Sequence, residues 1–191
     1  MMMADTNPKS DENCEANDGQ LINEARSNPA AFARLYRRHY DAVFRYCVHR
    51  LFKRQLAEDV TSLVFLSVVE NFHRFKGDEQ DFRNWLYTIA TNTANANLRK
   101  SARRNDLLKR ANEQPSGENS ADESSEKAAL LQKAILTLRP RYQTIITLRF
   151  FENLRLTEIA EVLGSSPGTV RSQLKRALYK LRKKVAFEQE V

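Results

Sequence analysis

The sequence predicts an all-α protein built from two small helical domains, an N-terminal helical bundle and a C-terminal helix-turn-helix domain, joined by a flexible linker. Three observations lead to this fold class. Apolar residues recur at three- and four-residue steps along most of the chain, as in amphipathic helices. No segment shows sustained alternation with a period of two, so no sheet is expected. A polar, acidic stretch separates two basic blocks.

The distribution of charge supports a two-module chain. With 191 residues, the chain is long enough for one ordinary domain or two small ones. Residues 30–104 carry 14 Lys/Arg against 7 Asp/Glu, and residues 130–184 carry 12 against 3. The formal net charge is +7, which makes a polyanion a plausible partner. Two basic modules on one chain favour contact with nucleic acid at two places.

The first module is expected at residues 20–104, after a disordered acidic tail at 1–19. Helices are expected over about 32–51, 55–72 and 82–104, with a charged loop around Gly77 between the second and the third. The third helix directs apolar residues to one side. Its other side carries polar and aromatic residues, namely Arg83, Asn84, Tyr87, Thr91, Asn92, Asn95 and Arg99. Aromatic and amide groups beside a cationic surface suit unstacked single-stranded bases, although core packing alone also explains Phe82 and Trp85.

Residues 105–127 are expected to form a flexible acidic linker. They contain Pro115, Gly117, several serines and a cluster of acidic residues. The second module then occupies residues 128–186, with helical periodicity that resumes at Leu130 and is broken at Pro140.

The C-terminal segment LTEIAEVLGSSPGTVRSQLKRALYKLRKK predicts a helix-turn-helix. Gly164 lies where the turn needs positive φ, Ser166 is a good N-cap and Pro167 a good first helical residue. The second helix would bury one apolar face and expose a basic one. Residues expected to contact DNA are Thr169, Arg171, Ser172, Lys175 and Arg176. A solvated basic face on a helical hairpin is the less favoured interpretation.

Several function classes find no support in the sequence. Cys14 and Cys47 are far apart, with no zinc spacing and no disulfide framework, and Cys47 is expected to be a buried free thiol. Asp78, Glu79 and Asp81 crowd one loop without a partner cluster, so we expect solvated acids and no metal site. There is no signal-peptide core and no apolar run long enough for membrane insertion. We therefore expect a cytoplasmic protein that is not an enzyme and needs no cofactor.

Four segments, in order, resemble the RNA polymerase sigma factors of the extracytoplasmic-function (ECF) type. These segments are FARLYRRHYDAVFRYC, AEDVTSLVFLSVVENFHRFKGD, FRNWLYTIATNTANANLRK and EIAEVLGSSPGTVRSQLKRALYKLR. The resemblance runs from about Gln20 to Lys184. It implies that residues 20–104 are sigma region 2, which binds core polymerase and the −10 promoter element. It also implies that residues 128–186 are sigma region 4, which reads the −35 element as duplex.

The resemblance also implies roles for particular residues. Asp59, Thr61, Ser62 and Phe65 lie on the helix that meets the polymerase clamp. The −10 strand would be held by Asn84, Tyr87, Thr91, Asn92, Asn95, Arg99 and Arg103, with the loop 77–84 and Asn92 forming a pocket for a flipped base. Expected partners are core RNA polymerase (the clamp of its largest subunit and the flap of the second largest), promoter DNA and an anti-sigma factor. Leu63 and Thr88 depart from the family pattern, which has a glutamate and a basic residue there.

Two alternatives remain at this stage: a stand-alone helix-turn-helix regulator that binds duplex DNA as a dimer, and, less favoured, a nucleic-acid enzyme.

A sigma factor must also span its two promoter elements, which lie near 50 Å apart. The linker reaches about 75 Å when fully extended. We therefore expect core polymerase to hold the linker extended, and the free protein to be compact.

Overall fold

The structure is a computed structural model that describes residues 18–110 and 124–189. The expected N-terminal tail up to residue 17 and the central part of the expected linker, 111–123, lie outside the described residues. The described residues are helical throughout their regular structure, with no strand among them, which confirms the all-α class. We refer below to α1–α4 as the N-terminal half and to α5–α8 as the C-terminal half.

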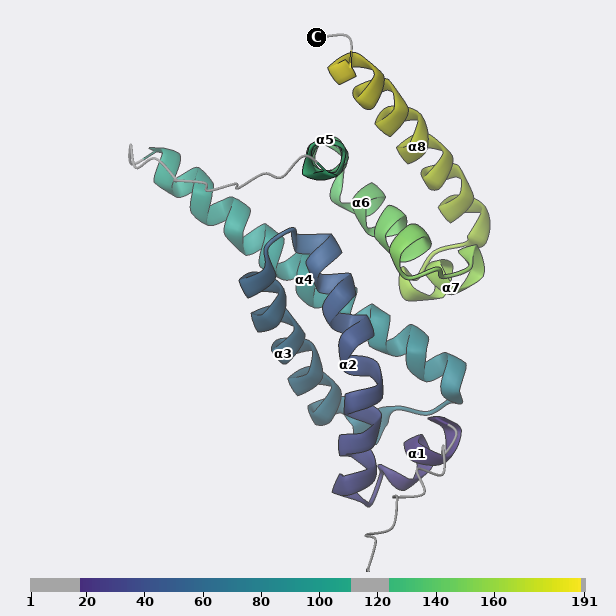
Figure 1. The fold of residues 1–191 in the computed structure, drawn as a ribbon. Coiled ribbons are helices and arrows are strands. Elements are labelled where there is room, and N and C mark those ends of the chain that lie inside the picture. Colours follow the sequence, from purple (N-terminus) through teal and green to yellow (C-terminus); the bar gives the residue numbers. More distant parts are fainter. Residues whose placement is uncertain (1–17, 111–123, 190–191) are drawn as a thin grey trace, which may run out of the picture.

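The N-terminal half is a bundle in which two long helices and a longer third one pack together (Figure 1). Its helices are α1 (Asp18–Glu24), α2 (Pro29–Leu51), α3 (Arg54–Asn71) and α4 (Glu79–Arg110), with a short 3-10 turn at Phe72–Arg74. The helices α2, α3 and α4 fall where the apolar periodicity predicts them. Two differences concern their ends: α4 begins within the expected loop, and it continues past residue 104 into the expected linker.

Local chemistry explains where these helices begin and end. The Asn28 side chain caps α2 by accepting a hydrogen bond from the Ala30 amide at 2.9 Å, and Pro29 supplies the first turn. Phe52 ends α2 in the left-handed region, with φ of 55°. At the start of α4, Asp78 and Asp81 exchange hydrogen bonds between side chain and backbone amide, at 3.0 and 3.2 Å.

The C-terminal half contains α5 (Ser124–Leu136), α6 (Pro140–Ile146), a π-helical turn at Thr147–Phe151, α7 (Leu156–Val162) and α8 (Pro167–Gln189). The expected helix-turn-helix is formed by α7 and α8. Gly164 has φ of +56° in the turn between them. Ser166 Oγ accepts from the Thr169 amide at 3.1 Å at the start of α8. Val170 and Ala177 are buried, so the apolar face of α8 points inward as expected.

The two halves share a hydrophobic core, and a smaller cluster lies within the C-terminal half. The shared core contains residues of α2, α3 and α4 together with Ile145, Leu148 and Ile159 of the C-terminal half. The helix α7 packs on α4, and the π-helical turn packs on α2. In Figure 1 the C-terminal half lies along one side of α4, with α8 on the outside of the molecule. This arrangement decides which predicted site residues reach solvent.

Candidate nucleic-acid interface

The outer surface of α8 carries the residues predicted to contact duplex DNA. Thr169, Arg171, Ser172, Lys175 and Arg176 are all exposed. A shallow cavity of about 470 Å³ follows this face and is lined by Ser172, Lys175, Arg176, Tyr179 and Lys180. Tyr179 is the most exposed of the large apolar side chains in the described chain, at 69%. The face combines guanidinium groups, an ammonium group, a hydroxyl and an open aromatic ring, all from one rigid helix whose opposite side is anchored in the core.

Such a surface fits the major groove of duplex DNA. Guanidinium groups near the start of an exposed helix can bind guanine in a bidentate manner. Lysine and arginine side chains further along the helix can contact phosphates. The Lys180 ammonium group lies 5.9 Å from the centre of the Tyr142 ring of α6, at the distance of a cation–π contact. Thr169 is an exception among the predicted contacts, because its hydroxyl is hydrogen-bonded to Ser166 Oγ at 2.9 Å in the N-terminal cap.

The polar face of α4 is divided between a buried part and an open part. Asn84, Tyr87 and Thr91 are buried, in contrast to the outward orientation that the helical pattern predicts. Asn92, Arg99 and Arg103 are exposed, and Asn95 is half-buried. Asn84 and Tyr87 bond groups of the C-terminal half, which is distant in sequence, whereas Thr91 is bonded inside the N-terminal half.

Three contacts hold the buried part of this face. The Tyr87 hydroxyl donates to Glu152 Oε2 at 2.7 Å. The Asn84 side-chain amide donates to the Glu161 carboxylate. Thr91 shares a hydrogen bond of 2.8 Å with the Tyr46 hydroxyl inside the N-terminal half. The first two partners belong to the C-terminal half, so this half contacts the polar face of α4 through specific hydrogen bonds.

Burial changes the acid–base properties of the groups at this contact. Removal from water raises the pKa of Glu152, and the hydrogen bond from Tyr87 opposes this increase. The pKa of Tyr87 is raised as well, first by burial and then by the nearby Glu152 carboxylate. Tyr87 therefore remains a hydrogen-bond donor to Glu152 at any ordinary pH.

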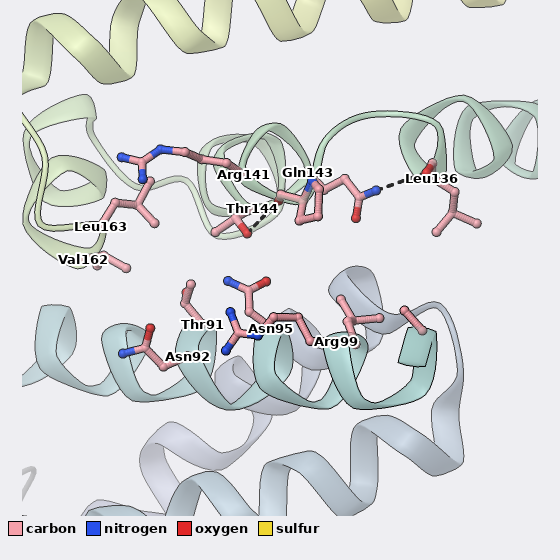
Figure 2. Close-up of a pocket in the computed structure, with 13 residues that line it drawn as sticks. Thr91, Asn92, Asn95, Arg99, Leu136, Arg141, Gln143, Thr144, Val162 and Leu163 are labelled. Carbon is pink, nitrogen blue, oxygen red and sulfur yellow. Dashed lines mark hydrogen bonds between the residues drawn. The ribbon is translucent and has the colours of Figure 1, made fainter. Parts of the chain in front are cut away.

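The open part of the face lines a cavity of about 590 Å³ between α4 and α6 (Figure 2). Asn92, Asn95 and Arg99 lie on the α4 side of it, and Arg141, Gln143 and Thr144 lie on the α6 side. Both sides of the cavity carry polar groups among a largely apolar lining, and Arg99 and Arg141 add positive charge. Its walls belong to both halves of the chain, so its shape depends on their mutual arrangement.

Arg50 is a central residue of this contact that the sequence analysis missed. Its side chain is 1% exposed, although it comes from α2. It donates to Asn95 Oδ1 at 2.7 Å, to Gln143 Oε1 at 2.8 Å and to Thr144 Oγ1 at 3.3 Å. All these acceptors are neutral, and burial lowers the pKa of the guanidinium. An arginine at the end of an amphipathic helix looks like a solvated charge in the sequence, so no local signal marks it.

The surface of α3 differs from the one expected to meet core polymerase. Asp59 and Ser62 are exposed, but Thr61 and Phe65 are buried in the core. Thr61 and Phe65 therefore act as supports for the helix and not as surface contacts. Three apolar residues of α3 are also exposed, namely Leu63, Leu66 and Val69, at 48%, 55% and 55%. Leu63 thus belongs to the surface and does not join the core.

Other predicted features concern cysteine, metal and membrane. Cys47 is buried, and burial raises the pKa of its thiol to about 11, while Cys14 lies outside the described residues. Across residues 18–110 and 124–189, no group of His, Cys, Asp or Glu has the arrangement of a metal site. Within the same part of the chain, no helix is both long and apolar enough to cross a membrane.

Comparison with known proteins identifies the family. Residues 35–104 match the family model of sigma-70 region 2, and residues 128–181 match that of sigma-70 region 4. The RNA polymerase sigma-H factor of Pseudomonas aeruginosa is 32% identical over 173 residues, which cover 84% of this chain and 89% of that protein. The chain belongs to the ECF sigma factors.

Further relatives agree with this assignment. The ECF sigma factor BldN of Streptomyces coelicolor is 36% identical over 165 residues, covering 83% of this sigma factor and 62% of BldN. The solved sigma factor RpoE of Bartonella quintana, in complex with the anti-sigma factor NepR, shares the fold with a TM-score of 0.65 at 20% identity. This match covers 81% of the present sigma factor and 96% of RpoE. The present chain is thus a subunit that directs RNA polymerase to promoters.

Proposed function

We propose that this sigma factor recognises a bipartite promoter through two separate surfaces, after binding core RNA polymerase. In this proposal the α8 face reads the −35 element as duplex. The α4 face, with Asn84, Tyr87, Thr91, Asn92 and Asn95, captures the melted −10 strand, and Arg99 and Arg103 hold its phosphates. The observation that carries the proposal is the exposed basic face of α8, which stands on the same chain as a second cluster of amide, aromatic and cationic groups.

The chemistry of each surface matches a different form of DNA. A rigid helix with Arg171 and Arg176 on its open side suits base edges in a major groove. Amide groups and an aromatic ring in a recess suit a single unstacked base, which can be hydrogen-bonded on its edge and stacked on its face. The sigma factor supplies binding groups only, so we propose no catalytic step and no cofactor.

The surface of α3 is proposed as the contact with the clamp of the polymerase. Asp59 and Ser62 flank the apolar residues Leu63, Leu66 and Val69, which are spaced to share one face of the helix. An exposed apolar stripe on a helix favours contact with another protein. We also propose contact between the C-terminal half and the flap of the second largest subunit, action in the cytoplasm, and control by an anti-sigma factor, as in the RpoE–NepR complex.

Transcription with purified core polymerase tests the proposal. Fragmented genomic DNA of the source organism is transcribed with core enzyme alone and with core plus sigma factor, and the RNA 5′ ends are sequenced. The expected result is a set of starts that require the sigma factor and share two motifs. Asn92→Ala should impair strand opening detected by permanganate, with duplex binding retained. Arg171→Ala should weaken binding at the upstream motif. If Asn92→Ala opens the strands normally and Arg171→Ala binds the upstream motif normally, the assignment of the two surfaces is wrong.

A further inference from the structure

The cavity between α4 and α6 has a composition that the proposed DNA contacts leave unexplained. Its volume of about 590 Å³ falls within the range of natural small-molecule sites, which is about 300–1,000 Å³. Apolar residues supplied by both halves form much of its lining, namely Leu98, Leu136, Pro140, Val162 and Leu163. Of the described residues that line it, Arg99 and Arg141 are basic and none is acidic. This lining suits a ligand that combines an apolar body with a negative charge.

The hydrogen-bond acceptors beside the cavity are largely taken up by Arg50. This guanidinium donates to Asn95 Oδ1 at 2.7 Å, to Gln143 Oε1 at 2.8 Å and to Thr144 Oγ1 at 3.3 Å. The Gln143 amide nitrogen and the Thr144 hydroxyl donate in turn to backbone carbonyl oxygens. These polar groups therefore satisfy one another and offer few acceptors to a ligand.

The groups that remain available are donors. Within the part of the chain that the structure describes, the Asn92 side-chain amide, Asn95 Nδ2 and the Arg99 guanidinium donate to no acceptor. Figure 2 shows Asn95 and Arg99 next to one another on the α4 side of the cavity. The Arg141 Nε donates to Gln173 Oε1 of α8 at 2.8 Å, so this guanidinium contributes charge at the rim. A donor-rich wall favours an anion, because charge-assisted hydrogen bonds are stronger than neutral ones.

Arg50 adds a positive charge directly behind this wall. Its side chain is 1% exposed, and its hydrogen bonds to described residues all end on neutral oxygen atoms. A buried charge is ordinarily paired with an opposite one. The Asn95 amide stands between the guanidinium and the cavity, since its oxygen accepts from Arg50 and its nitrogen is left for a ligand. An anion bound at that nitrogen would supply the compensating charge through one side chain.

We propose that this cavity is a binding site for a small organic acid. Its carboxylate or phosphate head accepts hydrogen bonds from Asn95 Nδ2 and from the Arg99 guanidinium. Its apolar body lies against the lining that Leu98 and Leu136 represent. The ligand also covers Asn92, so the ligand and a −10 strand exclude each other on α4. The site rests on the cavity alone, and only this exclusion rests on the proposed function.

A matched pair of ligands tests the need for a negative charge. The probes are naphthaleneacetate and its uncharged amide, which have nearly the same shape, together with naphthyl phosphate as a second acid. Each is titrated into the full chain by isothermal calorimetry. We expect one acid or both to bind with one-to-one stoichiometry, and the amide to bind at least about ten-fold more weakly. Binding of one acid alone would support the proposal and identify its head group. Equal affinity of acid and amide, or no binding of either acid at millimolar concentration, would overturn it.

Charge-removing variants of α4 locate the head group of the bound acid. Arg99→Gln should weaken binding of the acid at least about five-fold and leave the amide unaffected, because it removes a charge-assisted contact. Arg103→Gln is the matched control, since Arg103 is also exposed on α4 but does not line the cavity. It should have little effect on either probe. Equal effects of the two substitutions would contradict the placement of the acid.

Charge-adding variants of α5 locate its apolar body. Leu136→Glu places a carboxylate in the lining and should abolish binding of the acid. Leu131→Glu adds the same charge at another exposed position of α5, outside the lining, and should retain binding. Full affinity in Leu136→Glu would count against the cavity. Should this variant fail to fold by circular dichroism, the exposed Arg99→Gln substitution still decides the question.

Calorimetry also separates this inference from the proposed function. If the acid binds as expected but Asn92→Ala leaves strand opening intact, the acid site is correct and the −10 assignment is wrong. If neither acid binds while Asn92→Ala blocks strand opening, the −10 assignment stands and the acid site is wrong.

Discussion

At the scale of single residues, arginine side chains differ in their surroundings and therefore in what they can do. Arg171 and Arg176 are open to solvent, where the proposed function has them recognise DNA. Arg50 is buried and joins α2, α4 and α6 through hydrogen bonds. Arginines of this chain thus lie either on an open face that we propose to contact DNA or inside the contact between the two halves. Their positions relative to the C-terminal half decide between these roles.

The first prediction concerns the arginines of α8. Arg171→Ala and Arg176→Ala should each weaken binding of the upstream promoter element by about 1–3 kcal/mol, because each removes a candidate bidentate contact with a base. Gel-shift titration of the polymerase holoenzyme on promoter and mutated promoter measures this loss. Lys183→Ala, on a later turn of the helix, is the control. It should weaken binding to the promoter and to the mutated promoter to the same small extent. Unchanged sequence preference in both arginine variants would contradict the assignment.

The second prediction concerns His49, which stacks on Phe151 across the two halves at 4.0 Å between ring centres. Burial, followed by the nearby Arg45, lowers the pKa of His49 from 6.5. The contribution of this contact is therefore full above pH 6.5 and is lost as the pH falls through the folded-state pKa. Glu152 has the opposite dependence, because its raised pKa favours folding at low pH.

Comparison with His49→Phe isolates the histidine. Phenylalanine preserves an aromatic ring at this position but carries no titrating group, and the Glu152 contribution is common to both proteins. The free energy of unfolding, measured by urea titration between pH 7.5 and 5.5, should fall more steeply in the wild type than in the variant. Parallel pH profiles would show that the stacked histidine does not sense pH in the folded chain.

At the scale of elements, the start of α4 and the surface of α3 are the parts most closely linked to function. The α4 helix carries the face that we propose to bind the −10 strand, and its first turn is fixed by the reciprocal bonds of Asp78 and Asp81. Gly77 precedes this turn with φ of +152°. A Cβ atom at Gly77 would lie 2.6 Å from atoms of the Asp81 side chain. Both the backbone conformation and the available space therefore require glycine.

The third prediction follows from this turn. Gly77→Ala should destabilise the protein by more than about 1 kcal/mol, since it combines an unfavourable φ with a clash against Asp81. Gly168→Ala is the matched control, because a Cβ there meets its nearest atom at 3.9 Å inside a helix. That variant should be neutral or slightly stabilising. Thermal unfolding followed by circular dichroism measures both. Equal melting temperatures for the two variants would contradict the account of the turn.

The fourth prediction concerns the apolar stripe of α3. Leu66→Asp should weaken binding to core polymerase about ten-fold or more, which corresponds to about 1.4 kcal/mol. Leu66 is 55% exposed, so the change should leave the unfolding midpoint almost unaltered. Ala33→Asp, at an exposed position of α2, places the same charge elsewhere and serves as the control. Competition against a labelled sigma factor measures the affinity. If Leu66→Asp binds core polymerase with full affinity, this stripe does not contact the clamp.

Sequence reasoning succeeded for elements whose signals are local. The start of α8 was predictable because Gly164, Ser166 and Pro167 each have a conformational preference that acts within one turn. The burial of Asn84 and Tyr87 was not predictable, since their partners Glu161 and Glu152 lie far along the chain. A polar helix face covered by another part of the chain has the same pattern as one that faces water. Arg50 escaped notice for the same reason.

At the scale of the whole molecule, the two halves form a closed unit with a shared core and an open α8 face (Figure 1). A compact free protein was expected from the distance between the promoter elements. The structure adds which surfaces meet: α7 packs on α4, the π-helical turn packs on α2, and Arg50 of α2 bonds to α6. If the α4 face binds the −10 strand as proposed, its buried residues must become accessible, so recognition of both elements would require a change in the arrangement of the halves.

The central claim is that this sigma factor gives core polymerase its choice of promoter and does not act on DNA alone. Transcription of a genomic fragment library by core enzyme, with and without the full chain, tests it most directly. The account predicts RNA starts that appear only with both components and share an upstream and a downstream motif. Tight binding of the free chain to a palindromic duplex, together with no start that depends on it, would contradict the claim.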